Sequence, residues 1–385
     1  MSLILGIGTS VLPDASEAGR QAAETALQEL EGSAPALILV FTSTRYALQP
    51  LLAAIRATTG DVPLAGATSS GSFRDGVLTP PGEGVAVLAV TAGRYSFGVA
   101  SVTGVGSDPE DAGRRLARAA RATVAPQQGN HAALMLLADG LGGDLQLLLS
   151  GIYRVTGARV PVVGGAASDD RQMTQTFVLH DDEVLADGAV AVWIESDHPL
   201  HVVARHGWHA VTLPMIITRV DGQIVHEVGG RSAAEVYREH ADAAKVADSG
   251  LPPGYHSAHA FGLIESDGSH LIRGAFTGPD GLLRTFAPLP PYGAVEVVSC
   301  RPDDLLDVTE EVVAEALADQ DASLLLTFSC LARLDILGAR TSEEVARLQA
   351  AAGAVRTFGF YTYGEFARTN SVAGFHNATI TAIAL

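Results

Sequence analysis

The sequence predicts an α/β fold of three repeated units, each with the order strand, helix, strand, helix, strand, in largely parallel or mixed sheets. Two observations predict it: apolar runs of strand length alternate with amphipathic helical segments, and the same order of segments returns along the chain. A third observation, a hairpin-rich stretch at 216–291, predicts an inserted antiparallel β-rich segment before the third unit.

The first unit covers about residues 1–100, the second about 101–200 and the third 292–385. The third unit is expected to begin with the apolar strand VEVVSC at 295–300. Because the units alternate strands and helices, parallel pairing with right-handed crossovers is expected, with helices covering the sheets.

End signals support the predicted helices. Asp14-x-x-Glu17 and Thr341-x-x-Glu344 are capping-box patterns, in which a side-chain oxygen accepts an N–H that the first helical turn leaves unpaired. Gly353 predicts the end of the helix that starts near Thr341, because helices commonly end on a residue with positive φ.

Two similar turn sequences indicate where recognition takes place. GATSSGSF at 66–73 and GFYTYGEF at 359–366 share the pattern Gly-x4-Gly-x-Phe, and both are interpreted as turns. The later copy carries Tyr361, Tyr363 and Glu365 where the earlier copy has only threonine and serine. We therefore expect recognition in the later turn.

The inserted segment marks a division of the chain. Asp-Gly pairs at 221–222, 267–268 and 280–281 supply hairpin turns, and one helix is expected at 232–245. These features predict an N-terminal domain over 1–214 and a C-terminal domain over 215–385.

Composition limits the classes of function. The net charge of −18 opposes binding to nucleic acid and to anionic membranes. The apolar runs are too short to span a bilayer, and the first residues lack a signal-peptide pattern, so a cytoplasmic location is expected. Cys300 and Cys330 lie in apolar contexts rather than in a disulfide framework.

No metal or cofactor is expected. The histidines between His198 and His209 fit metal-ligand spacing poorly, and neither a P-loop nor a dinucleotide glycine pattern occurs. The pair Asp169-Asp170 is interpreted as part of a solvated turn.

In α/β sheets, ligands bind at the carboxyl ends of strands, which here are followed by 42–45, 139–143 and 329–333. Arg333 could bind a carboxylate through its planar fork of donors, and Glu365, beside Gly364, could accept hydrogen bonds from an amine. Together they would suit a zwitterion such as an amino acid.

Both residues also have a structural interpretation, as ion pairs of Arg333 with Asp335 and of Glu365 with Arg368. Tyr361 and Tyr363 share one face of an extended segment, where they would line a pocket or pack in the sheet. The complete candidate set for ligand binding is Arg45, Thr68, Ser69, Ser329, Cys330, Arg333, Tyr361, Thr362, Tyr363, Glu365, His376 and Asn377.

An enzyme is the competing interpretation. Cys330 and His376 would form a thiol nucleophile and its base if they lay within hydrogen-bond reach. A buried cysteine that behaves as a small apolar residue is the commoner case. No catalytic residue is therefore assigned.

The chain resembles the FIST proteins, which have a FIST N-terminal and a FIST C-terminal domain. The segments that carry the resemblance are FTSTRY, VPLAGATSSG, HGW, TRVDGQIVHEVGGRSAAEVY, FSCLAR, GFYTYGEFAR and FHNATIT. The resemblance implies an intracellular sensory protein that binds small ligands, with amino acids as the proposed class.

The resemblance has one departure. FIST relatives often have Cys and Glu in the first turn, where this chain has Ala67 and Ser72. A thiol or carboxylate function is therefore not expected there. The chain ends with its last strand, so a signal is expected to pass to a separate protein partner; a protein-interaction scaffold is the remaining alternative.

Overall fold

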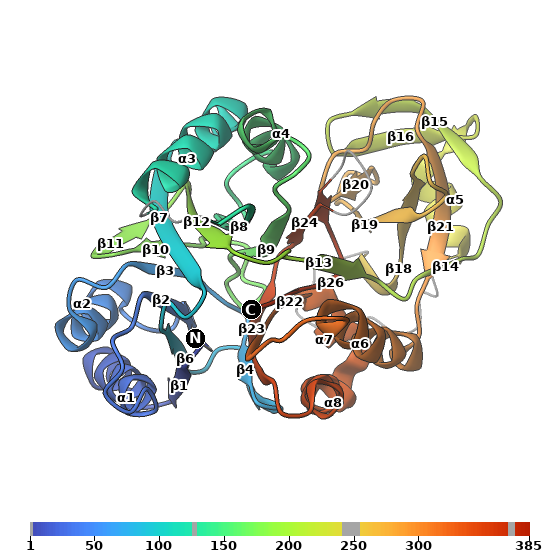
Figure 1. Ribbon diagram of the computed structural model, residues 1–385. Coiled ribbons are helices and arrows are strands. Elements are labelled where there is room, and N and C mark those ends of the chain that lie inside the picture. Colours follow the sequence, from blue (N-terminus) through green and yellow to red (C-terminus); the bar gives the residue numbers. More distant parts are fainter. Residues whose placement is uncertain (1–2, 125–128, 241–254, 369–373) are drawn as a thin grey trace.

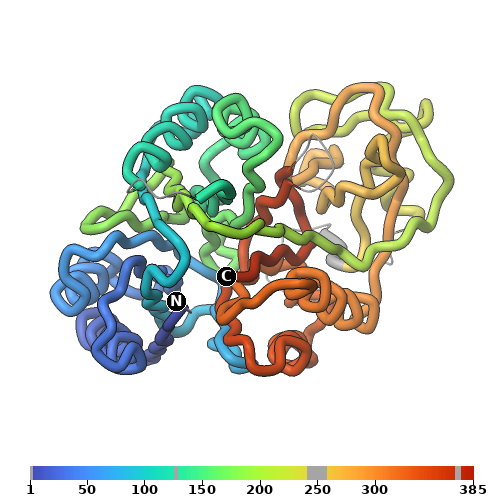
Figure 2. Tube along the Cα trace, viewed as in Figure 1, coloured from blue at the N-terminus to red at the C-terminus, as the bar shows by residue number. Residues whose placement is uncertain are grey.

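The computed structural model describes residues 3–124, 129–240, 255–368 and 374–385. It confirms the α/β class with mixed sheets. Figure 1 shows three lobes of sheet and helix around a common centre, with a β-barrel beside two of them. The chain trace in Figure 2 passes through the lobes in turn and enters the barrel from the segment at 202–210.

Three sheets of the described chain have six strands each, in corresponding orders. The first contains β1 (Leu5–Ser10), β6 (Val85–Val90), β2 (Leu37–Thr42), β3 (Leu64–Thr68), β10 (Val178–His180) and β11 (Glu183–Leu185). The second contains β7 (Tyr95–Thr103), β12 (Gly188–Ser196), β8 (His131–Ala138), β9 (Val162–Ala166), β24 (Glu365–Ala367) and β25 (Phe375–His376). The third contains β13 (Val202–Arg205), β26 (Ile380–Ala384), β22 (Leu324–Cys330), β23 (Arg356–Thr362), β4 (Ser72–Arg74) and β5 (Val77–Thr79).

The sheets are mixed rather than largely parallel. In each, one pair is parallel, namely β2–β3, β8–β9 and β22–β23, and the other pairings are antiparallel. The last two strands of each sheet come from another lobe: β4 pairs with β23, β10 with β3 and β24 with β9. Each lobe thus gives a strand pair to one neighbour and receives one from the other, which ties the three lobes into a ring.

The expected start of the third unit is wrong. Strand β21 (Ala294–Ser299) pairs within the barrel, and β13 takes the edge position of the third sheet instead. The barrel is therefore inserted after the first strand of this sheet. A pattern of apolar residues identifies a strand but does not say which sheet it joins.

The interpretation of Gly66 and Gly359 as turn residues is also wrong, because both lie inside parallel strands. A Cβ atom at Gly359 would lie 1.9 Å from the carbonyl oxygen of Thr327, and one at Gly66 would lie 2.4 Å from that of Val40. These glycines permit close approach of the neighbouring strand. The chain turns later, around Gly71 and Gly364.

Helices cover the outer faces of the three sheets (Figure 1). They are α1 (Ala15–Gln28) and α2 (Leu48–Thr59) on the first sheet, α3 (Pro109–Thr123) and α4 (Leu145–Thr156) on the second, and α6 (Pro302–Leu317) and α8 (Thr341–Ala352) on the third. Short elements α7 (Leu331–Leu337) and η1 (Gly338–Arg340) connect β22 to α8.

The two capping predictions have different outcomes. Asp14 caps α1 and accepts from the N–H of Glu17 at 2.9 Å, as expected. The capping box at Thr341 is wrong, because its hydroxyl donates to the Gly338 carbonyl and Glu344 turns into the protein. Gly353, with φ of 61°, ends α8 as predicted.

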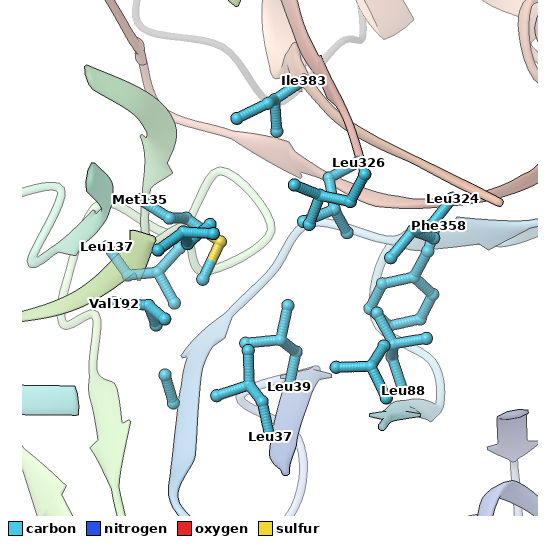
Figure 3. Close-up of a cluster of buried hydrophobic side chains, with 14 of the residues drawn as sticks. Leu37, Leu39, Leu88, Met135, Leu137, Val192, Leu324, Leu326, Phe358 and Ile383 are labelled. Carbon is cyan, nitrogen blue, oxygen red and sulfur yellow. The ribbon is translucent and has the colours of Figure 1, made fainter. Parts of the chain in front are cut away.

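The inner faces of the three sheets share one apolar core, part of which Figure 3 shows. Leu37 and Leu39 of the first sheet, Met135 of the second and Leu326 of the third point into it. Phe41 lies in the same core. The three lobes are thus packed through a common interior.

The inserted segment forms a barrel of six strands that closes where β18 pairs with β21. Its strands are β21, β15 (Met215–Asp221), β16 (Ile224–Val228), β20 (Leu283–Thr285), β19 (His270–Thr277) and β18 (Tyr255–Ile264), with β14 (His209–Ala210) and β17 (Arg231–Ser232) attached. Hairpins turn at all three predicted Asp-Gly pairs. Helix α5 (Ala233–His240) begins the helix expected at 232–245, whose last residues lie outside the described residues.

In the described parts of the chain, no helix is both long and apolar enough to cross a membrane.

Candidate functional site

A cavity of about 430 Å³ lies where the second and third lobes meet the barrel. Its walls come from the loop after β8, the loop after β9, the ends of β22 and β23, the start of α7 and the barrel strands β19 and β20. Apolar side chains make up much of the lining. The principal polar ones are Asp144, Arg171, Cys330, Asp335, Thr362 and Asn377.

The cavity lies at the carboxyl ends of a parallel strand pair. Cys330 is the last residue of β22, and Thr362 is the last residue of β23. Both line the cavity, together with the sequence candidates Tyr363 and Asn377. Since parallel neighbours end on the same edge, two segments far apart in sequence meet at one wall.

Arg333 does not line the cavity. Its side chain is fully buried, and its Nε atom donates to Glu344 at 2.7 Å. It also donates to the carbonyl of Leu305 at 3.0 Å and to the hydroxyl of Thr309 at 2.9 Å. The alternative of an ion pair is right in kind, but the partner is Glu344 and not Asp335.

Tyr361 and Ser329 belong to the same buried network. The Tyr361 hydroxyl donates to Glu344, and burial, followed by the charge of Glu344, raises the pKa of Tyr361 well above its usual value. The Ser329 hydroxyl lies 3.4 Å from both carboxylate oxygens of Glu344. These residues stabilise the packing of α8 on the third sheet rather than face the cavity.

Glu365 lies behind the cavity wall. It is fully buried and accepts hydrogen bonds from the Thr362 hydroxyl, the Thr379 N–H and the Cys330 thiol. Burial raises its pKa to about 8, although these hydrogen bonds lower it. The predicted pair with Arg368 is absent, since Arg368 lies over the Tyr153 ring and donates to the carbonyl of Gly157.

Glu365 is expected to make the protein less stable as the pH rises from about 5 to 8. In this window the native state keeps a proton that the unfolded chain has lost, so the stability contribution is complete below the unfolded pKa and disappears as the pH passes about 8. The free energy of unfolding should fall by about 1.4 kcal/mol per pH unit from this group.

Urea denaturation at pH 5, 6, 7 and 8 tests this expectation. Glu365→Gln keeps the shape and has no titrating proton, so the free energy of unfolding of this variant, relative to that of the parent, should rise with pH. Glu311→Gln, at an exposed position on α6, serves as the control. Parallel pH curves for the parent protein and Glu365→Gln would contradict the assignment.

Cys330 and His376 do not form the thiol and base pair of an enzyme. The His376 Nε2 atom lies 2.9 Å from the Ala367 carbonyl, and burial lowers the pKa of His376 to about 4. Burial, followed by the charge of Glu365, raises the pKa of Cys330 well above its usual value. A neutral thiol is a poor nucleophile.

Asn377 lines the cavity and has one polar atom without a partner among the described residues. Its Nδ2 atom donates to the His376 carbonyl at 3.2 Å, whereas its buried Oδ1 atom has no hydrogen-bond partner among the described residues. A buried acceptor without a partner is costly. A donor on a bound molecule would satisfy it.

Arg171 and Asp335 form an ion pair on the cavity lining that the sequence analysis missed. The Nε atom of Arg171 donates to Asp335 at 2.9 Å. Burial raises the pKa of Asp335, and Arg171 partly opposes this effect. The two residues lie in different lobes, so no local pattern pairs them.

The interpretation of Asp169 as part of a solvated turn is wrong. Asp169 is 1% exposed and accepts from the N–H groups of Met173 and Thr174 and from the Tyr363 hydroxyl. It holds a loop in which Arg171 has a φ of 68° and Met173 one of 51°. Such backbone strain is concentrated at ligand sites and switches, and both residues line the cavity.

Asp144 is a further cavity residue missed from the sequence. It caps α4, and its Oδ1 atom accepts from the N–H groups of Gln146 and Leu147 at 2.9 and 3.1 Å. The other carboxylate oxygen has no hydrogen-bond partner in the described residues. The sequence signal that could have identified Asp144 is its position directly after the predicted loop at 139–143.

The candidates of the first lobe lie away from the cavity. Arg45 is exposed and approaches the Gly82 carbonyl at 3.5 Å. Thr68 is buried and bonds to the backbone of Phe177, while the N–H of Ser69 donates to the carbonyl of Thr42. Within the described ranges, no group of three or more His, Cys, Asp or Glu residues is placed to hold a metal ion.

A concave site of this size, largely apolar with a few polar groups, is typical of proteins that bind small molecules. The chain matches the FIST N domain over residues 36–231 and the FIST C domain over residues 233–368. It therefore belongs to the FIST family, whose domains are in general sensory domains that bind small ligands.

Several similar proteins are bacterial or archaeal. An uncharacterised protein of Mycobacterium tuberculosis strain H37Rv is 28% identical over 97% of this chain and 96% of its own length. One from Mycobacterium bovis is 25% identical over 96% of both chains. A short match of 26% identity to an uncharacterised protein of Methanocaldococcus jannaschii covers 21% of this chain and 16% of the other.

Proposed function

We propose that this protein is an intracellular sensor that binds a small polar metabolite, an amino acid, in the cavity and signals through a separate protein partner. The observation that carries the proposal is the cavity itself, whose lining contains charged residues of both signs and Asn377, a residue with an unpaired Oδ1 atom. The sensory role of the FIST family supports it.

The lining has the charges that a zwitterion requires. Asp144 offers a carboxylate oxygen for an ammonium group. Arg171 offers a carboxylate the guanidinium donors that its pair with Asp335 leaves free. Asn377 can accept a further ammonium hydrogen. These three residues take the roles that the sequence suggested for Arg333 and Glu365, which lie behind the wall.

Asp144→Asn is expected to weaken amino-acid binding at least tenfold. The amide still caps α4, since asparagine is as good a cap as aspartate, but the charge that attracts the ammonium group is lost. A charge-assisted hydrogen bond is worth about 1.5–3 kcal/mol, which corresponds to roughly a tenfold to hundredfold change in Kd. Isothermal titration calorimetry measures the change, after a thermal-shift screen of the common amino acids has selected the ligand.

The matched control is Asp108→Asn. Asp108 caps α3 by accepting from the Asp111 N–H at 3.0 Å, and it does not line the cavity. Equal affinities of Asp144→Asn and Asp108→Asn for the amino acid would show that Asp144 does not bind it. A screen in which no amino acid raises the Tm would refute the proposed ligand class.

The same screen separates the alternatives. Product analysis after incubation reveals an enzyme, and turnover that is lost in Cys330→Ser would refute the binding-only interpretation. A scaffold would capture a protein partner with no response to any small molecule.

A further inference from the structure

We infer that the ligand is an amino acid with a large apolar or aromatic side chain, which lies against the barrel while its charged head faces the α/β lobes. This inference rests on the proposed function and adds the substrate class. It follows from the way in which the cavity walls divide polar from apolar groups.

The charged lining residues all come from the α/β lobes. Asp144 begins α4, Arg171 lies in the loop after β9 and Asp335 lies on α7. Asn377, with its unpaired Oδ1 atom, precedes β26. A ligand with one charged end is therefore oriented by this side of the cavity.

The barrel side of the lining carries no charged residue. It presents Phe276, Phe286, Ala287 and Pro288, with Gln223 and Thr285 as its polar side chains. Phe375, from the strand β25 that neighbours the barrel, continues the apolar wall. In Figure 1, β19 and β20 lie on the side of the barrel that faces β24.

Two phenylalanine rings form the centre of this wall. The ring centroids of Phe276 and Phe286 are 5.2 Å apart, with an interplanar angle of 35°. A Cβ atom at Gly274 would lie 2.9 Å from the Phe286 ring, so the glycine allows the ring to lie close to β19. Both rings are partly buried and line the cavity.

Size and polarity together select the class. A volume of about 430 Å³ is near the low end of the range of roughly 300–1,000 Å³ for ligand sites, which suits a single amino acid rather than a long peptide or a dinucleotide. Aromatic side chains prefer offset or tilted contacts with other rings, and burial of their apolar surface is favourable. A small or doubly charged amino acid would leave the barrel wall exposed to water.

The test measures calorimetric affinities of the full chain for phenylalanine, tryptophan, leucine, alanine, serine, aspartate and lysine. We expect phenylalanine, tryptophan or leucine to bind at least tenfold more tightly than alanine or serine. Phe286→Ala should reduce the affinity for the preferred ligand at least tenfold, whereas Phe286→Leu, which keeps apolar volume, should retain most of it. Phe276→Ala removes the other ring of the same wall and should likewise reduce the affinity.

Tyr292→Asn is the control. Tyr292 is an aromatic residue of the inserted segment that is 78% exposed and lies outside the cavity. Its φ is positive, and asparagine tolerates this conformation. Tighter binding of small or charged amino acids would overturn the inference and leave the proposed function intact. Folded Phe286→Ala and Phe276→Ala proteins with parental affinity would do the same. The absence of binding by every amino acid would overturn both.

Discussion

Glu344→Ala should lower the free energy of unfolding by about 3–5 kcal/mol, because it leaves the buried guanidinium group of Arg333 without its counterion. Glu344 is 1% exposed and Arg333 is 0% exposed. The carboxylate also accepts hydrogen bonds from Tyr361 and lies within reach of Ser329. The substitution therefore removes the shared acceptor of a whole network.

Urea denaturation followed by circular dichroism measures the loss. Glu343→Ala, on the neighbouring position of α8, removes an exposed partner of Arg340 and should have little effect. The double variant Arg333→Met with Glu344→Leu should recover much of the lost stability, because an apolar pair needs no compensating charge. A single variant Glu344→Ala as stable as Glu343→Ala would show that the buried pair contributes little.

Local features of the fold could be predicted from the sequence. The Asp14 cap, the Gly353 helix end and the three Asp-Gly hairpins depend on residues within a few positions of one another, and all are confirmed. Cys330 could be selected in the same way, since it ends a predicted strand. Thr362 was selected within a segment interpreted as a turn, whereas it ends β23.

The exchange of strand pairs could not be predicted. Pairing of β4 with β23 places Phe73 opposite Gly359, and the register depends on contacts between segments far apart in sequence. An apolar alternation does not state which sheet receives a strand. The same limit explains why β21 was assigned to the third unit rather than to the barrel.

The candidate site shows a related limit. The pattern Thr341-x-x-Glu344 has the residues of a capping box, yet the carboxylate is used in the interior because the buried Arg333 stabilises it there. Arg171 and Asp335 meet only when two lobes pack. A charged residue on its own in a sequence therefore does not reveal whether its partner is a ligand, water or a distant side chain.

Phe41→Ala should cost about 3–5 kcal/mol of stability, as large-to-small substitutions of buried phenylalanine do. Phe41 belongs to the first sheet, but its ring lies 4.2 Å from that of Phe360 and 5.2 Å from that of Phe358, both in the third sheet, when measured between centroids. The side chain is 0% exposed in the core that all three sheets share. The space left by the missing ring would therefore lie between lobes and not within one.

This position also tests whether the lobes unfold together. Because the core is common and strand pairs are exchanged around the ring, the three lobes should unfold in one transition in both the parent protein and Phe41→Ala, measured by calorimetry and by urea denaturation. Phe41→Leu should recover part of the loss, and Phe97→Ala, a partly buried residue packed against the same core, should cost less. If Phe41→Ala destabilised only the first lobe and produced a separate early transition, the shared core would not couple the lobes. A single transition at lower urea is expected, because a side chain packed between two sheets stabilises both.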